Sequence, residues 1–134
     1  MKKIAFILLF IVFNICSLYS EEYYKINDNS LKILKDAGIE VSEEQKESIN
    51  MILKKYSRNI KNALNELNDI NSKLNNEYKK SDVNINIIKE LIFERKKKEA
   101  DFDYLIISCD LDILELFSDI DIKKIKYYIL FSKK

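Results

Sequence analysis

Hydrophobic residues recur along the middle of this chain at a spacing that alternates between four and three positions. Lys, Asn, Glu and Ser fill most of the positions between them. A heptad spacing of this kind places the apolar residues on one face of a helix. It therefore predicts a long amphipathic helix over residues 43–79. The residues that follow the spacing are Ile49, Leu53, Tyr56, Ile60, Ala63, Leu67, Ile70 and Leu74.

A second segment resumes the same spacing a few residues later. Between the two lie Lys79, Lys80, Ser81 and Asp82, where cations near the last carbonyls and a Ser–Asp pair indicate that one helix ends and another begins. Two amphipathic helices joined by so short a connection fold back on one another, which predicts a long antiparallel hairpin. The second set of positions is Ile85, Ile88, Ile92, Arg95, Glu99, Phe102, Ile106, Cys109, Ile113 and Leu116.

Two parts of this second helix depart from the simple pattern. Arg95 and Glu99 lie one turn apart and can pair, either in a solvated part of the hairpin or in a polar functional site. The segment 104–117 is apolar on nearly every side, so the terminal helices or a second subunit must cover it on more than one face. Taken alone this segment also suits a strand, but the unbroken spacing from Ile85 favours a helix.

A nine-residue pattern occurs twice, as VSEEQKESI (41–49) and as FSDIDIKKI (117–125). In the first copy, Ser42 suits a helix N-cap and Gln45 suits the residue that reaches back to it, as in a capping box. Gly38 suits the C-terminal cap of a short preceding helix over 29–37. The first copy therefore begins the long helix and places Ile49 on its apolar face.

In the second copy, Ser118 and Asp121 take the positions of the cap and its partner. This copy predicts a last helix that runs to about residue 131 and carries Ile125 on its apolar face. One capping box is common in proteins, but the two copies also share apolar flanking residues, Val41 and Phe117.

The first twenty residues have the order of a secretory signal peptide. Lys2 and Lys3 precede an apolar run over 4–13, and small and polar residues lead to a plausible cleavage site after Ser20. The run is shorter than the roughly 20 residues that cross a bilayer, which disfavours an uncleaved anchor. Lipid attachment to Cys16 is an alternative, although the residues before it suit lipoprotein cleavage poorly. Residues 21–134 are then expected to form one all-helical domain.

The composition favours helices and disfavours several functions. There is no Pro and one Gly, and 34% of the residues are charged. Without Lys2 and Lys3, 21 of the 23 basic residues remain against 22 acidic ones, a balance that does not suggest nucleic-acid binding. The absence of His excludes a Ser-His-Asp or Cys-His catalytic unit and the usual His-containing metal site, and a single Gly excludes a phosphate-binding glycine loop. We expect neither enzyme activity nor a cofactor.

Cys109 is the one cysteine that follows the predicted cleavage site. It cannot form a disulfide within the mature chain, although it could pair between two chains in an oxidising compartment. More often, a residue of this kind is a small buried hydrophobe.

The two repeats resemble the two LTxxQ motifs of the Spy/CpxP family of small periplasmic proteins. The first reads VSEEQ and retains Gln45, whereas the second reads FSDID and has Asp121 in place of Gln. The resemblance covers nearly all of the mature chain. It implies a four-helix, cradle-like subunit that forms an antiparallel homodimer. Members of the family act as ATP-independent chaperones, as envelope-stress regulators or in heavy-metal resistance, and the absence of His argues against the last role.

The resemblance implies that unfolded or aggregation-prone envelope proteins bind to a mixed basic and apolar helical surface. Cations would attract a client early and apolar groups would hold it loosely. A solvated helix face is the other interpretation of the same residues. Two further functions stay open: a regulator that binds the periplasmic domain of a sensor kinase, and a coiled-coil structural surface protein. The candidate client-binding residues are Lys54, Lys55, Tyr56, Arg58, Phe93, Arg95, Lys96, Lys97 and Lys98.

Overall fold

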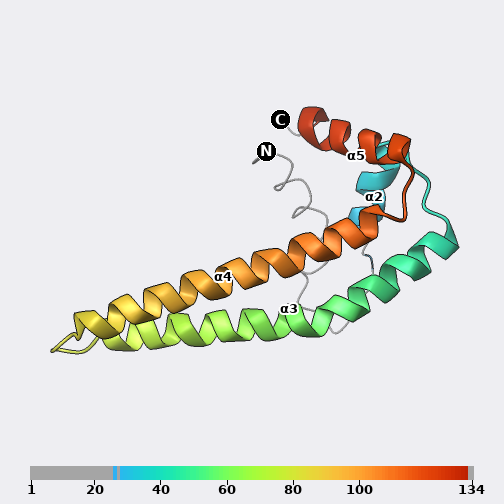
Figure 1. Cartoon of the computed structure of the whole chain (residues 1–134). Helices are drawn as coiled ribbons and strands as arrows, with labels where there is room; N and C mark the ends of the chain where they lie inside the picture. Colours follow the sequence, from blue (N-terminus) through green and yellow to red (C-terminus); the bar gives the residue numbers. More distant parts are fainter. Residues whose placement is uncertain (1–25, 27, 133–134) are drawn as a thin grey trace. The chain divides into compact units, whose positions relative to one another are not determined.

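The computed structural model describes residue 26 and residues 28–132, and this part of the chain is all-α, as predicted (Figure 1). The predicted signal peptide, its cleavage site and Cys16 lie outside the described residues. None of the described helices is long and apolar enough to cross a membrane. The helices are α2 (Asp28–Asp36), α3 (Glu43–Tyr78), α4 (Ile85–Leu114) and α5 (Asp119–Ser132).

The residue contacts divide the chain into two units. Unit 1 contains residues up to Ser57 and from Ile106 onward, and unit 2 is the continuous segment Arg58–Leu105. Each of the two long helices, α3 and α4, therefore contributes one part to unit 1 and another to unit 2.

In unit 1, α2 ends in the way that its glycine predicts. Gly38 has a φ of 85°, a left-handed conformation that glycine adopts without the steric cost of a Cβ atom. Its N–H donates to the carbonyl of Lys35 at 2.9 Å, and the N–H of Ile39 donates to the carbonyl of Leu34 at 2.9 Å. These two bonds form a Schellman motif, and both Leu34 and Ile39 are buried beside it.

The apolar end of α4 is buried on more than one face within unit 1. Cys109 is fully buried, in keeping with a small hydrophobe, while Leu111 is the large apolar residue of this stretch that stays about half exposed. A single chain therefore covers most of residues 106–117 but not Tyr104 at the start of the predicted segment, and α2, α3 and α5 all contribute residues to the same core. Among the described residues of unit 1, the buried apolar ones are Leu34, Ile39, Ile49, Leu53, Ile106, Cys109, Ile113, Leu114, Phe117, Ile125 and Ile129.

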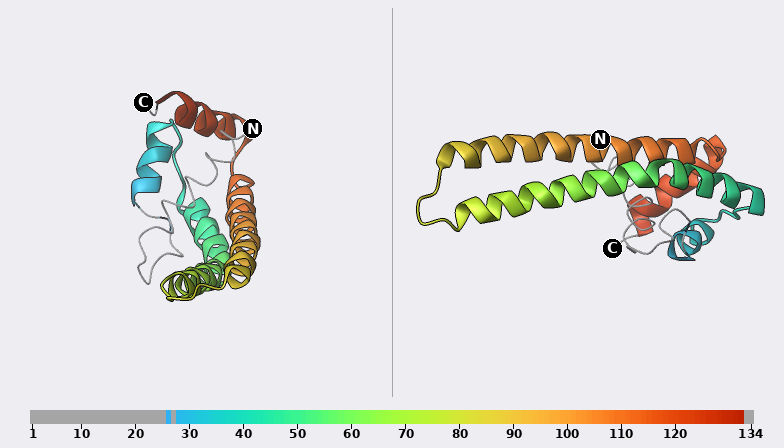
Figure 2. Two further views of the ribbon diagram at one scale, coloured as in Figure 1. Left: turned by 90° about the vertical axis from the view of Figure 1, so that its left-hand side faces the viewer. Right: turned by 90° about the horizontal axis from the view of Figure 1, so that it is seen from below.

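Unit 2 consists of the C-terminal part of α3, the N-terminal part of α4 and the connection between them. The two helical parts run side by side in opposite directions (Figures 1 and 2). Lys98 pairs with Glu66 and Arg95 contacts Asn71, so partners that come later on α3 lie opposite partners that come earlier on α4. This order is that of an antiparallel hairpin.

The predicted seam of α4 is wrong at its beginning. Ile85 is 71% exposed and Ile92 is 38% exposed, whereas Leu91 is buried. The sequence INIIKELI has apolar residues at both 91 and 92, and either one lies in heptad phase with Ile88 and Arg95. The structure selects Leu91, and Ile85 lies in the first turn of α4, next to the loop that connects α3 to α4.

Candidate functional site

The first sequence repeat forms a complete capping box at the start of α3. Ser42 Oγ accepts a hydrogen bond from the Gln45 N–H at 3.1 Å, and Gln45 Oε1 accepts one from the Ser42 N–H at 3.0 Å. Two backbone donors that would otherwise lack a helical partner are therefore bonded. Ile49, one turn further along, is fully buried.

Gln45 also connects the two repeats, a role that the motif alone does not indicate. Its Nε2 donates to the carbonyl of Leu116 at 3.3 Å, immediately before the second repeat begins at Phe117. Phe117 is buried and Val41 is half-buried. The side chain that caps α3 therefore also contacts the segment between α4 and α5.

The second repeat caps α5 with half of the same arrangement. Ser118 Oγ accepts a hydrogen bond from the Asp121 N–H at 3.1 Å. Among the described contacts, the Asp121 carboxylate does not return to the Ser118 N–H but lies 4.0 Å from Lys124 Nζ. Asp is one methylene shorter than Gln, which leaves its carboxylate less reach toward the cap. Ile125 is buried, like Ile49 in the first repeat.

Some residues of the first candidate client-binding cluster, on α3, form polar contacts with other residues of unit 1. The Tyr56 hydroxyl donates to Asp112 Oδ2 at 2.6 Å, and Lys55 Nζ lies 3.9 Å from the same oxygen and 5.3 Å from the Tyr56 ring. These contacts join α3 to the end of α4. Like Lys55, Lys54 and Arg58 are exposed, and neither of these two has an ion pair with another described residue.

The second candidate cluster, on α4, also divides into bonded and exposed members. Arg95 and Lys96 both pair with Glu99, at 3.6 and 3.3 Å. Lys98 Nζ lies 2.6 Å from Glu66, and this hydrogen bond raises the pKa of Lys98 above its ordinary value. The expected Arg95–Glu99 pair is therefore present, as part of a partly exposed ion-pair network in unit 2.

The exposed members of the second cluster extend into a stripe on the outer face of α4. Lys89, Phe93 and Lys97 are four residues apart, a spacing that places them on one helix face, and Tyr104 falls on the same face two turns later. Phe93 is 66% exposed and Tyr104 is 68% exposed. Among the described residues, neither Lys89 nor Lys97 has an ion pair. We call these four residues the α4 stripe.

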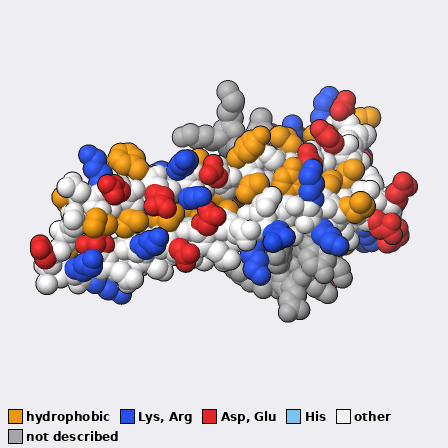
Figure 3. All heavy atoms as spheres, turned by 60° about the horizontal axis from the view of Figure 1, so that its bottom comes forward, with side chains coloured by type: hydrophobic (Ala, Val, Ile, Leu, Met, Phe, Trp, Pro, Cys, Tyr) orange, Lys and Arg blue, Asp and Glu red, His pale blue; other side chains and the backbone are white. Residues whose placement is uncertain are grey.

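Figure 3 shows hydrophobic side chains interspersed with basic and acidic ones on the hairpin. The sequence-based list of client-binding candidates includes Phe93 and Lys97 but not Lys89 and Tyr104. That list is drawn from adjacent residues, whereas the stripe joins positions one or two helical turns apart.

The connection between α3 and α4 contains a polar cluster that the sequence pattern did not indicate. Glu77 is buried, and its carboxylate accepts hydrogen bonds from Lys80 Nζ at 2.9 Å and from the Asn84 N–H at 3.2 Å. These bonds, that of Lys80 first, lower the pKa of Glu77 below its ordinary 4.5. Asn84 Oδ1 accepts from the Asn86 N–H at 3.0 Å, so Asn84 caps α4 in place of the expected Ser81–Asp82 pair.

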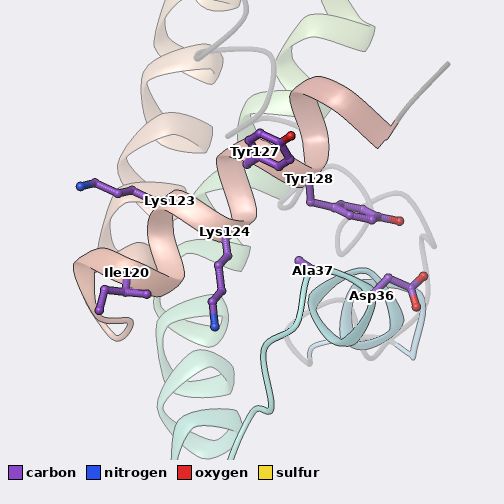
Figure 4. A pocket seen from close by; sticks show the side chains of 7 residues that line it. All are labelled: Asp36, Ala37, Ile120, Lys123, Lys124, Tyr127 and Tyr128. Carbon is purple, nitrogen blue, oxygen red and sulfur yellow. The ribbon is translucent and has the colours of Figure 1, made fainter.

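An open hollow of about 550 Å³ lies in unit 1 between the end of α2 and α5 (Figure 4). Its walls are mostly apolar or basic. Within the described residues, no group of three or more His, Cys, Asp or Glu side chains could hold a metal ion. The residues that line the hollow are Asp36, Ala37, Ile120, Lys123, Lys124, Tyr127 and Tyr128.

Comparisons of the chain with protein-family models, with curated proteins and with solved structures found no match.

Proposed function

We propose that the mature chain is an ATP-independent periplasmic chaperone of the Spy/CpxP type, which acts as a homodimer and binds unfolded envelope proteins on the α4 stripe. The observation that carries this proposal is the exposure of two large aromatic residues on one helix face: Phe93 lies between Lys89 and Lys97, and Tyr104 lies two turns beyond Lys97. Exposed aromatic residues beside cations suit a client that is held loosely through contacts of both kinds.

The structure narrows the candidate surface for this proposal. Lys55, Tyr56, Arg95, Lys96 and Lys98 already have polar partners within their units. A client would have to displace those partners before it could use these side chains. The proposal therefore rests on the α4 stripe, and Lys54 and Arg58 remain secondary candidates.

The first test is the aggregation of a denatured model protein, followed by light scattering without ATP. Suppression near one dimer per client, weakened by added salt, is the expected result. Covering a large aromatic side chain contributes about 2 kcal/mol. The double substitution Phe93→Ala and Tyr104→Ala should therefore raise the amount of protein needed for half suppression by about thirtyfold or more.

Matched controls separate the α4 stripe from general surface effects. Met51 is 74% exposed on α3, so Met51→Ala should leave suppression unchanged. Lys89→Glu with Lys97→Glu should weaken suppression, whereas Lys61→Glu, at an exposed position on α3, should not. Absence of suppression at every ratio would refute the chaperone and would favour the sensor-kinase regulator or the structural coiled coil.

A further inference from the structure

The last helix, α5, is apolar on two opposite faces. One face carries Ile125 and Ile129, which are buried in unit 1. On the other face Ile120 is 68% exposed, Tyr127 is 67% exposed and Phe131 is 60% exposed. A helix that is hydrophobic all round normally has a neighbour on each side. The second side of α5 therefore offers a surface for a partner outside this chain.

The exposed residues form one stripe with a cation on each side of it. Ile120, Tyr127 and Phe131 are separated by seven and four positions, which places them in line along the helix. The rings of Tyr127 and Phe131 lie 4.7 Å apart, at an interplanar angle of 38°. Lys123 and Lys124 occupy adjacent helical positions, and Figure 4 shows their side chains pointing in different directions. We call these five residues the α5 face.

The charge of the α5 face selects among its possible occupants. The first turn of α5 contains Asp119 and Asp121, and Lys124 Nζ lies 4.0 Å from the Asp121 carboxylate. After Asp121, the described part of α5 has Lys123, Lys124 and Lys126 and no acidic residue. If a second copy docked through the same face, the twofold arrangement would bring two sets of these lysines together, and like charges oppose such contact. A negatively charged occupant would instead pair with Lys123 and Lys126, which have no ion pair among the described residues. It would also compete with Asp121 for Lys124.

The arrangement of apolar and basic side chains suits a flat anionic surface. Helices that lie in a membrane interface bury an apolar face shallowly, while lysines on the flanks reach the lipid phosphates. Aromatic residues such as Tyr127 favour the headgroup level. We propose that α5 is an interfacial helix that docks the protein on a bilayer containing anionic lipids. This inference does not depend on the proposed chaperone activity.

The direct test uses a tryptophan as a reporter of burial, since the sequence contains none. Phe131→Trp places a single tryptophan on the α5 face, and Tyr104→Trp is the control at a similarly exposed position on α4. The chain from Glu21 onward is used, because the apolar run over 4–13 would itself enter lipid. With phosphatidylglycerol-containing vesicles, the emission of Phe131→Trp should shift to shorter wavelength, while that of Tyr104→Trp should not.

Binding strength tests the role of the lysines. Each lysine near an anionic surface strengthens binding by about fivefold. Lys123→Gln with Lys124→Gln should therefore lower the binding constant for anionic vesicles, measured by sedimentation, by about thirtyfold. Lys89→Gln with Lys97→Gln, on the α4 stripe, should leave it unchanged. Circular dichroism of each variant checks that the helices are retained.

Several outcomes would overturn the inference. These are no binding to anionic vesicles, equal binding to vesicles of phosphatidylcholine alone, and binding that the α5 substitutions do not change. A shift in Phe131→Trp emission that depends on protein concentration without vesicles would assign the α5 face to a second copy. Binding to polyglutamate but not to vesicles would assign it to an acidic protein segment.

Discussion

The two units of this chain contain parts of the same two long helices, but the contacts that stabilise each unit internally are of different kinds. In unit 1, buried apolar residues come from α2, α3, α4 and α5, and they include the fully buried Ile49 and the nearly inaccessible Ile125. In unit 2, every residue of which the structure describes, the buried apolar residues are Ile60, Ile70 and Leu91. Exposed polar contacts such as Lys98–Glu66 supplement them.

This difference locates the stability of the chain. Burying one large aliphatic side chain contributes about 1.5–3 kcal/mol, whereas an exposed ion pair contributes about 0–1 kcal/mol. Most of the free energy of unfolding should therefore come from unit 1, and unit 2 should open locally at a lower cost. The α4 stripe lies in unit 2, where a thin two-helix arrangement leaves Phe93 and Tyr104 in solvent.

The largest expected effect comes from removing a buried side chain of unit 1. Ile125→Ala should lower the free energy of unfolding by about 3 kcal/mol, because it loses buried apolar surface and leaves a cavity. Urea unfolding followed by circular dichroism measures this change. Ile120→Ala, on the exposed side of the same helix, should change the free energy by less than about 0.5 kcal/mol. Equal effects of the two substitutions would contradict the assignment of the core.

The next largest loss of stability is expected from changes to the cap of α3, in unit 1. Ser42→Ala should cost about 1 kcal/mol, because the Gln45 N–H loses its acceptor. Gln45→Glu keeps the oxygen that accepts from the Ser42 N–H but removes the amide that donates to Leu116, and should cost about 1 kcal/mol. Urea midpoints of both variants measure these losses.

Ser118→Ala is the comparison for the caps. The capping box of α5 has one of the two reciprocal bonds. Ser118→Ala should therefore lower the free energy of unfolding by no more than Ser42→Ala does. An unchanged midpoint for Ser42→Ala would refute its capping role. An unchanged midpoint for Gln45→Glu alone would mean that the bond to Leu116 contributes nothing to stability.

Local signals predicted the helices better than the contacts between them. The end of α2 follows from Gly38, and the start of α3 follows from Ser42 and Gln45, because each depends on residues a few positions apart. The Gln45–Leu116 bond spans 71 positions and depends on the folded chain.

The site was less predictable, for the same reason. Tyr56 was assigned to a client surface from its basic neighbours, but its hydroxyl bonds Asp112, which lies 56 positions away. Periodicity also did not choose between Leu91 and Ile92, because both fit the heptad phase. The choice depends on how α4 packs against its neighbour.

The smallest expected effect tests whether the end of unit 2 opens by itself. The pKa of Glu77 is lowered in the folded chain, so the stabilisation from its carboxylate is complete above about pH 4.5 and is lost as the pH falls through the lower folded value. Glu77→Gln should remove the stabilisation from this carboxylate at neutral pH. Hydrogen exchange should then show less protection at Asn84 and in the first turn of α4, while the urea midpoint stays nearly constant.

Glu90→Gln is the matched control, because Glu90 is an exposed carboxylate on the same hairpin. At every pH, Glu90→Gln should leave the hydrogen-exchange protection of Asn84 the same as in the unsubstituted chain. If Glu77→Gln instead lowered the urea midpoint as much as the loss of a core side chain, unit 2 would unfold together with unit 1. The contrast between an apolar core and a separately opening hairpin would then be wrong. A local loss of protection would mean that the hairpin can open while the core of unit 1 remains folded.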